Sequence, residues 1–489
     1  MLTPRLNPKV HHSTGRSQID AGIGPPRAVS SSISSCGRAA GRVPVGSTGS
    51  ARRYGAPVPV AAIASFGHRS YRYFWFGGLT ASSARWFQYV ALPAVVWDLT
   101  RSPGWVGFAG FAQFAAMALM APVAGTVADH YPRRNILMVS QSFMGLVAVV
   151  MAVAWSQGVR SPTAYVALAA ASGLGGGLNL PVWQSFVSEL VPRDLLLNAV
   201  TLNSAQFNGS RLVGPMLGGI TVAAAGPAVA FWVSAAGALV VVFALVRIES
   251  RKAAAAASGM RVIRNMVTVA RYVADRRGLV VAFVTASLIG SLGLSIQILT
   301  VVFAEDVFHR GPGGFGLMLT MLGAGAVAAA PVVASLGGRV PRSQIQRVAL
   351  VVYGAAVAAL AVAPSFASYL VPLAFIGAAH LASASSLNTA VQLQVAEERR
   401  TQVMSLYVMV LMSSNPLGQL LLGQLIELVG PRPAFGAYGA LLLAGTAALH
   451  GSGWLRHLDV EVGEYSPEVA PEVHPTTPSP PRPKRRSSS

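Results

Sequence analysis

The chain has 489 residues, of which 53% are hydrophobic and only 11% are charged. Soluble globular proteins carry about a quarter charged residues, so this composition excludes an ordinary soluble enzyme or DNA-binding protein. A single cysteine, Cys36, excludes an internal disulfide framework. Apolar stretches of about 20 residues recur along most of the chain, and each is long enough to cross a bilayer as a helix. The composition therefore indicates an all-α integral membrane protein.

In chain order, residues 1–72 are rich in Ser, Gly, Pro and Arg, and we expect a disordered, basic, cytoplasmic N-terminal extension there. Twelve apolar spans follow in two six-helix halves, at 73–247 and 279–456. Between the halves, residues 248–278 alternate Arg with apolar residues, which predicts an amphipathic linker helix on the cytoplasmic membrane face. Residues 457–489 are Pro-rich and predict a disordered cytoplasmic tail. The predicted spans are 74–98, 105–128, 135–157, 163–187, 198–224, 228–247, 279–304, 317–338, 347–364, 369–394, 402–428 and 434–455.

The distribution of charge predicts how the chain is oriented. Of the 37 Lys and Arg residues, 31 fall on the side that carries both termini, two lie inside spans and four lie on the other side. Those four are Arg101, Arg160, Arg310 and Arg432. Because positively charged loops stay in the cytoplasm, we expect both termini to be cytoplasmic in a multi-pass protein of the cell membrane. Membrane topology then explains the net charge of +20, and we expect no nucleic-acid partner.

The two halves share weak sequence matches. Pro132 recurs as Pro341, 209 residues later, and Pro215 recurs as Pro416, 201 residues later. The similar offsets favour an internal duplication. Two parallel six-helix repeats with a binding site at their interface are typical of one large class of transporters.

The segment after the second span reads Gly125-x3-Asp129-x3-Arg133-Arg134. In residue type, spacing and place in the topology it resembles the signature loop of the major facilitator superfamily, although Pro132 stands where many members have Gly. The resemblance implies the twelve-helix fold of that superfamily and a loop that latches one half against the other in the outward-facing state. Asp129 and Arg133 are also spaced for an ion pair along a helix. The alternative is that Arg133 and Arg134 only anchor the loop at the membrane surface.

The fifth span carries Arg211, Gly214, Pro215, Gly218 and Gly219 in an arrangement that resembles the motif of drug and metabolite antiporters in the same superfamily. Glycines one turn apart let a neighbouring helix approach closely, and the proline can kink the span. Any tightly packed membrane helix could show small residues at this spacing, so simple helix packing is the alternative.

The sequence around this motif narrows the resemblance. Residues 188–194, 198–203 and 402–407 are similar to the enterobactin-exporter and macrolide-efflux branch of the superfamily. The similarity covers residues 66–456 and leaves both tails outside it. It implies export of a drug, siderophore or natural product.

Polar side chains inside the spans are candidates for a substrate cavity. Arg85 and Arg211 fall near the middle of spans one and five, where an arginine that faces lipid costs roughly 3 kcal/mol or more. We therefore expect both to face the cavity or a polar partner. All 17 acids lie in loops, tails or span ends, so an anionic substrate would supply the missing countercharge. The further cavity candidates, which could instead form bonds between helices, are Gln88, Asn203, Asn208, His380 and Asn388.

A proton antiporter needs a group that titrates as the site opens to each side. Asp98, Glu427 and His380 are the candidates, and none is decisive. We find no nucleotide-binding loop and no cluster of Cys and His, so we expect no enzymatic activity, no cofactor and no metal.

The leading interpretation is a monomeric secondary transporter in the lipid bilayer. We expect it to export a small organic molecule by alternating access, with protons as the coupling ion. Two alternatives stay open. One is an importer or facilitator of a metabolite, and the other is a membrane sensor or scaffold that acts through its tails.

Overall fold

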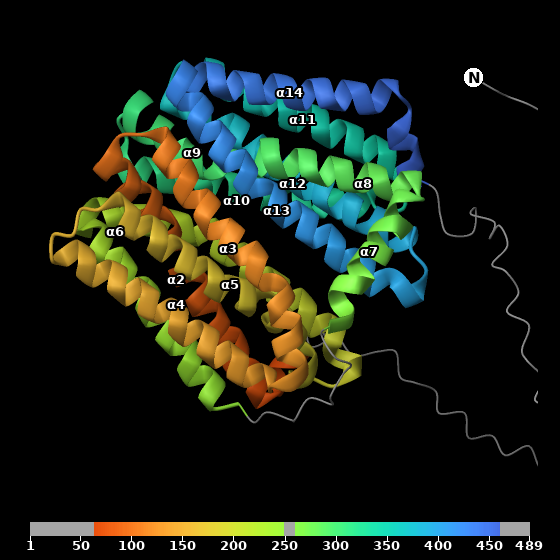
Figure 1. Ribbon diagram of the computed structural model, residues 1–489, viewed down its shortest axis with the longest axis horizontal. Coiled ribbons are helices and arrows are strands. Elements are labelled where there is room, and N and C mark those ends of the chain that lie inside the picture. The colour runs from red at the N-terminus through yellow and green to blue at the C-terminus, as the bar shows by residue number, and fades with distance from the viewer. Residues whose placement is uncertain (1–62, 249–259, 460–489) are drawn as a thin grey trace, which may run out of the picture. The chain divides into compact units, whose positions relative to one another are not determined.

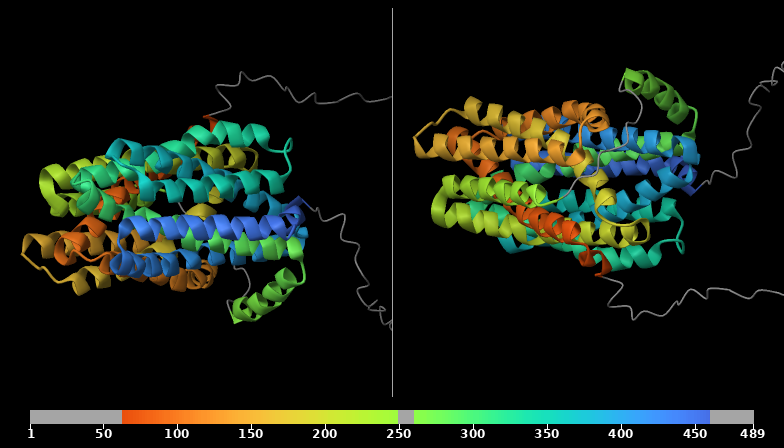
Figure 2. Two further views of the ribbon diagram at one scale, coloured as in Figure 1. Left: turned by 90° about the horizontal axis from the view of Figure 1, so that it is seen from above. Right: turned by 90° about the horizontal axis from the view of Figure 1, so that it is seen from below.

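A computed structural model describes residues 63–248 and 260–459, apart from the side chains at 121, 122, 125, 126, 129, 260–266, 398 and 401. Every element in these residues is helical, and the long helices run side by side in Figures 1 and 2. The α-helices are α2 Arg69–Thr100, α3 Pro103–His130, α4 Arg133–Ser156, α5 Pro162–Leu190, α6 Leu196–Val246, α7 Met260–Ala274, α8 Arg277–Leu288, α9 Ile296–Val302, α10 Gly311–Leu336, α11 Arg342–Val362, α12 Phe366–Leu393, α13 Glu397–Val429 and α14 Pro431–Gly451. The 3₁₀ and π helices are η1 Ala64–Gly67, η2 Arg193–Leu195, η3 Ile289–Leu294, η4 Phe303–Val307 and η5 Trp454–Asp459.

The helices agree with the predicted all-α membrane fold. Ten segments of the described residues are long and apolar enough to cross a membrane, with α6 counted once. Gly226 interrupts α6 with φ 83° and ψ 167°, so it consists of two helices, 196–225 and 227–246. Counting α6 as two, and adding α2, which carries Arg85 in its middle, gives the predicted twelve spans.

Span seven is less regular than its hydropathy suggests. It runs from Arg277 to Val307 as α8, η3, α9 and η4, and both η3 and η4 are π-helical. Wide π turns of this kind occur mostly as single insertions within α-helices and are frequent at functional sites.

Helical structure extends beyond the predicted halves at both ends. At the start, Ser65 is buried and donates hydrogen bonds from its backbone N and its Oγ to Oδ1 of Asn198, at 3.0 and 2.6 Å. At the end, Asp459 accepts a bond of 3.0 Å from the backbone N of Ser343 and so caps α11. These polar contacts hold segments that the hydropathy pattern assigns to the tails. Residues 1–62 and 460–489 lie outside the described residues.

The predicted linker contains α7, which Figure 2 shows outside the rows of long helices. Val269 and Val273 are buried, so one side of its C-terminal part packs against the bundle. Two guanidinium groups lie near the ring of Tyr272, that of Arg276 3.6 Å and that of Arg399 4.9 Å from its centroid. Residues 249–259 of the linker lie outside the described residues.

Equivalent backbone turns recur in the two halves. Gly226 and Gly430 precede the last span of each half, and their φ/ψ angles are 83°/167° and 84°/165°. A side chain is strained at such a positive φ, which explains why both positions are glycine. Pro132 and Pro341 likewise precede α4 and α11 with φ of −56° and −55°. The duplication suggested by the prolines therefore extends to the backbone.

The halves meet along two pairs of helices, α3 with α13 and α6 with α10. Glycines make the close approach possible. A Cβ on Gly107 would lie 2.4 Å from the carbonyl O of Gln419, and a Cβ on Gly316 would lie 2.4 Å from that of Pro215. We call the end of the bundle where α2 begins the basic end, and the end where α3 begins the opposite end. Both of these contacts lie toward the opposite end, and the halves diverge toward the basic end in Figure 1.

Candidate functional site

Two arginines lie at the middle of their spans. Arg85 is halfway along α2, and Arg211 is halfway along the 196–225 part of α6. Arg85 is exposed and Arg211 is half-buried. Among the described residues, neither guanidinium forms a hydrogen bond or an ion pair. The positive charge predicted for the middle of the bundle is therefore present there without a countercharge from the described part of the chain.

Arg211 has aromatic and imidazole neighbours from both halves. It acts electrostatically on Tyr89 of α2, Tyr353 of α11 and His380 of α12. The rings of Tyr353 and His380 lie edge to face with centroids 6.2 Å apart. Arg85 lies one helical turn from Tyr89 and shares its side of α2. We call these five residues the arginine cluster.

Two polar atoms of the arginine cluster are buried without a partner. The hydroxyl of Tyr353 and Nδ1 of His380 form no hydrogen bond in the described residues. Most buried polar atoms in proteins are bonded, so these two atoms are available to hydrogen-bond a polar group that enters the site beside Arg211.

The π-helical part of span seven makes room for Tyr353. A Cβ on Gly293 would lie only 2.6 Å from the hydroxyl and Cζ of that tyrosine. The serines of this span bond within their own helix: Ser291 Oγ donates to the carbonyl O of Ser287 at 2.7 Å, and Ser295 Oγ donates to that of Ser291 at 2.6 Å. The glycine, rather than the serines, therefore shapes this side of the arginine cluster.

The four predicted amide candidates form other contacts. Gln88 is buried, donates to Ser172 Oγ at 3.1 Å and accepts from Ser234 Oγ at 3.2 Å, so it ties α2 to α5 and α6. Asn203 accepts a bond of 3.4 Å from Nε1 of Trp183. The amide of Asn208 donates to a carbonyl of its own helix at 2.9 Å, and that of Asn388 bonds Gln392 one turn along. Arg85, Arg211 and His380 are the predicted candidates that fall within the arginine cluster.

The signature loop forms contacts inside the N-terminal half. Arg133 forms an ion pair with Glu189 of α5, a partner that the i, i+4 spacing did not predict. Arg134 donates to the carbonyl O of Leu245 at 2.8 Å and that of Val246 at 3.2 Å, and so caps the C-terminal end of α6. The side chains at Gly125 and Asp129 lie outside the described residues, so the latch stays a prediction.

The glycines of the fifth span pack against two different helices. Gly214 faces Trp86 of α2, where a Cβ would lie 2.5 Å from Cδ1, and Gly218 faces the α2 backbone. Gly219 faces Gly316 of α10 in the other half. Pro215 is buried at the same crossing. The motif therefore joins the halves and also positions Arg211, whose carbonyl group packs against α10.

The two predicted acids lie at the opposite end of the bundle. Asp98 forms an exposed ion pair of 3.2 Å with Arg101 in its own half. Glu427 of α13 accepts hydrogen bonds from Ser102 Oγ at 3.0 Å and from the backbone N of Gly104 at 3.1 Å. A carboxylate of the C-terminal half therefore caps the first turn of α3 in the N-terminal half, far from the arginine cluster.

Sequence reasoning missed two members of the arginine cluster, Tyr89 and Tyr353. Tyr89 could have been found, because it follows Arg85 by one helical turn. Tyr353 is a single aromatic residue in an apolar span, and nothing in the sequence separates it from a core residue.

The chain resembles proteins of known family and fold. A family model described as transmembrane secretion effector matches residues 60–472. The multidrug efflux pump Tap of Mycobacterium tuberculosis is 25% identical over 377 residues, which cover 74% of this chain and 88% of the relative. A pump of the same name from Mycolicibacterium fortuitum is 25% identical over 393 residues, covering 76% and 93%.

Solved structures share the fold at low identity. The nucleoside transporter NupG superposes with a TM-score of 0.65 at 12% identity, covering 78% of this chain and 98% of that one. The D-xylose-proton symporter gives a TM-score of 0.61 at 12% identity, covering 76% and 96%. Because the family match spans most of the chain and both six-helix halves, this chain belongs to the transmembrane secretion effector family of the major facilitator superfamily and is a membrane transporter, not an enzyme.

Proposed function

We propose that the chain exports a small organic anion across the cell membrane. The observation that carries this proposal is the arginine cluster, in which Arg85 and Arg211 have no acidic partner among the described residues. An uncompensated charge inside a membrane protein is costly, so a bound anion would stabilise the site. The efflux pumps to which the chain is similar favour export over uptake.

The cluster is suited to an anion with an aromatic or hydroxylated body. Arg211 can present a planar fork of donors to a carboxylate or a similar group. The free hydroxyl of Tyr353 and the ring of His380 lie on the side of the C-terminal half. A ligand that bonds residues of both halves can favour one arrangement of the halves over another, which is the requirement for alternating access.

The contacts between the halves support an inward-facing arrangement. Glu427 and the glycine crossings join the halves toward the opposite end. The basic end would be cytoplasmic by the positive-inside rule. Export by alternating access would then require these contacts to break while the signature loop closes the basic end.

Proton coupling is assigned to His380 in this proposal. Of the three predicted candidates, His380 is the one beside Arg211, whereas Asp98 and Glu427 lie at the opposite end. Coupling requires a group that titrates as the site opens to each side. His380 is placed so that such a change of charge would occur beside Arg211.

The test is transport by the purified chain in proteoliposomes, with an anionic dye and a permanently cationic dye as probes. Arg85→Gln and Arg211→Gln should each lower anion transport about tenfold or more, because a bond to a charged group contributes roughly 1.5–3 kcal/mol. Arg211→Lys should restore part of the rate, since Lys keeps the charge and loses the fork. Arg160→Gln is the matched control, because Arg160 bonds the carbonyl O of Trp155 at the end of α4 and that of Val159 in its own loop, both at the opposite end.

Three outcomes would contradict the proposal. Strong transport of the cationic dye that neither arginine substitution changes would refute an anion site. Transport of the anionic dye only in the inward direction would favour the alternative that the protein is an importer of a metabolite. Loss of all transport on deleting residues 1–62 and 460–489 would favour a protein that acts through its tails.

A further inference from the structure

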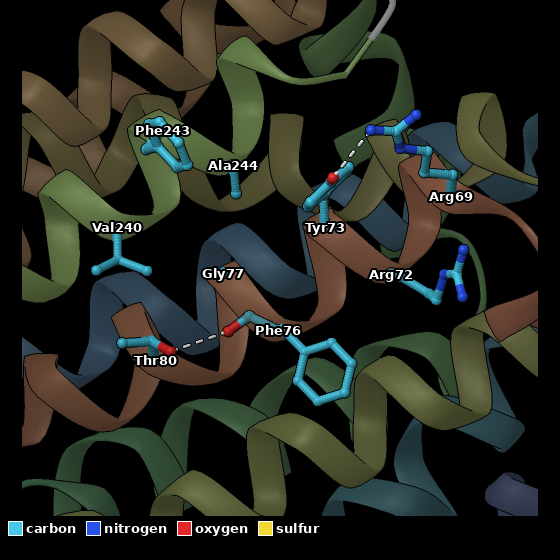
Figure 3. Close-up of a pocket in the computed structure, with 9 residues that line it drawn as sticks. All are labelled: Arg69, Arg72, Tyr73, Phe76, Gly77, Thr80, Val240, Phe243 and Ala244. Carbon is cyan, nitrogen blue, oxygen red and sulfur yellow. Dashed lines mark hydrogen bonds between the residues drawn. The ribbon is translucent and has the colours of Figure 1, made fainter.

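A second basic site lies on the surface of the N-terminal half, away from the arginine cluster. Between α2 and the last part of α6 there is a groove of about 480 Å³. Arg69 and Arg72 line one end of it, and Val240 and Thr80 lie at the other, as Figure 3 shows. The arginine end is at the basic end of the bundle, where α2 begins and α6 finishes.

Arg69 and Arg72 line this end of the groove, and a third arginine, Arg247, lies beside two of the lining aromatic residues. Arg69 Nη2 donates to the hydroxyl of Tyr73 at 3.3 Å and so holds the tyrosine at the rim. Arg72 is exposed. Arg247, also exposed, lies with its guanidinium 4.6 Å from the ring centroid of Phe243 and acts electrostatically on Tyr73. No acidic residue is among the described residues that line the groove.

The rest of the groove is apolar. Phe76 is 57% exposed and Phe243 is 59% exposed, so both present aromatic surface along its sides. Gly77 forms its floor, where a Cβ would lie 2.8 Å from Cβ of Ala244, and the helices therefore touch beneath it. Polarity falls from the arginines toward Val240, which is the direction from the membrane surface to its interior.

We propose that this groove binds an anionic phospholipid of the leaflet at the basic end. The three arginines are opposite in charge to a phosphodiester headgroup and can donate hydrogen bonds to its oxygens, and basic pockets between membrane helices on the cytoplasmic side are suited to such headgroups. The exposed aromatic walls match an acyl chain and have no role in binding a free inorganic anion. The site is independent of transport chemistry, because none of its residues belongs to the arginine cluster.

The test is native mass spectrometry of the full chain released from detergent, titrated with phosphatidylglycerol and, separately, with phosphatidylcholine. The wild type should retain phosphatidylglycerol at lower concentration than phosphatidylcholine. Replacing both Arg72→Gln and Arg247→Gln should weaken phosphatidylglycerol binding about thirtyfold, since each arginine near an anionic lipid surface contributes about five- to sixfold. Arg69 is kept because it also bonds Tyr73.

The matched control removes the same charge elsewhere at the basic end. Arg193→Gln with Arg339→Gln replaces two exposed arginines outside the groove and should leave phosphatidylglycerol binding unchanged. Phe243→Ala should weaken phosphatidylglycerol binding severalfold, because it removes one aromatic wall of the groove. Inorganic phosphate at the same concentration should not displace the lipid.

Four results would overturn the proposal. They are equal binding of the two lipids by the wild type, unchanged binding after the Arg72 and Arg247 substitutions, an equal loss in the control variant, and displacement of the lipid by inorganic phosphate. The last result would identify a site for a soluble phosphate instead.

Discussion

Replacing Glu427 with Gln should weaken the closure of the opposite end. The Glu427 carboxylate belongs to α13, yet it accepts hydrogen bonds from Ser102 Oγ and from the backbone N of Gly104 in the other half. A negative charge at the first turn of a helix gains both from charge-assisted hydrogen bonds and from the helix dipole. Gln keeps the size and one acceptor oxygen but loses the charge.

The expected effect is modest because Glu427 is exposed. Charge at an exposed helix start contributes about 0.3–1 kcal/mol. A hydrogen bond to a charged group exceeds a neutral one by roughly 1 kcal/mol, and solvent reduces this difference. Together these give about 1 to 1.4 kcal/mol, which corresponds to a fivefold to tenfold shift of the population toward opening at the opposite end.

The shift can be measured as a distance distribution between spin labels. Gln157→Cys and Val362→Cys place one label on each half at the opposite end, in a Cys36→Ser background. Glu427→Gln should increase the population at the longer distance. Asp306→Asn is the control, since Asp306 is an exposed acid of η4 that forms no hydrogen bond or ion pair in the described residues. An unchanged distribution for Glu427→Gln, or an equal change in the control, would refute the reasoning.

Four further substitutions test how the helices are held together. Gly316→Ala places a methyl group 2.4 Å from the carbonyl O of Pro215. The α6 and α10 helices must therefore move apart at a cost of about 1–3 kcal/mol, and the same spin labels should report opening. An unchanged distance between the labels would show that the contact between α6 and α10 accommodates the methyl group without opening. Gln88→Leu leaves two buried hydroxyls without their partner and should lower thermal stability by about 1–3 kcal/mol, measured as the unfolding midpoint in detergent, while substrate preference stays the same. A changed preference would place Gln88 in the site instead. Asp129→Asn and Arg133→Ala should each slow turnover at equal surface abundance by unbalancing the two conformations, and wild-type turnover in both would exclude the predicted latch.

The sequence alone determined the membrane class, the twelve spans and the superfamily. Apolar length is a one-dimensional property, because each helix must satisfy its own backbone across about 30 Å of hydrocarbon. The Gly125 to Arg134 segment added a specific signal, since residue type, spacing and place in the topology coincide. A stronger signal of duplication was also present and was overlooked, in the Gly226-Pro227 and Gly430-Pro431 pairs that precede the last span of each half.

The candidate site was predicted in part. Arg85, Arg211 and His380 stood out because charged and titratable side chains are expensive in hydrocarbon, and the reason holds wherever the neighbouring helices lie. Gln88 is polar but uncharged, and it bonds two serines 84 and 146 residues away. Its amide is satisfied inside one half, and no local pattern distinguishes that case from a cavity residue.

Only the tertiary structure decided which helix faces which. Helical periodicity gives the side of a helix on which a residue lies, but not the partner across from it. The capping of α3 by Glu427 joins positions 323 residues apart, and the Tyr353 ring occupies space that a side chain at Gly293 would fill. These contacts depend on the packing of several helices at once, whereas the spans depend on each helix separately, and for that physical reason the sequence determined the spans and the folded bundle determined the site.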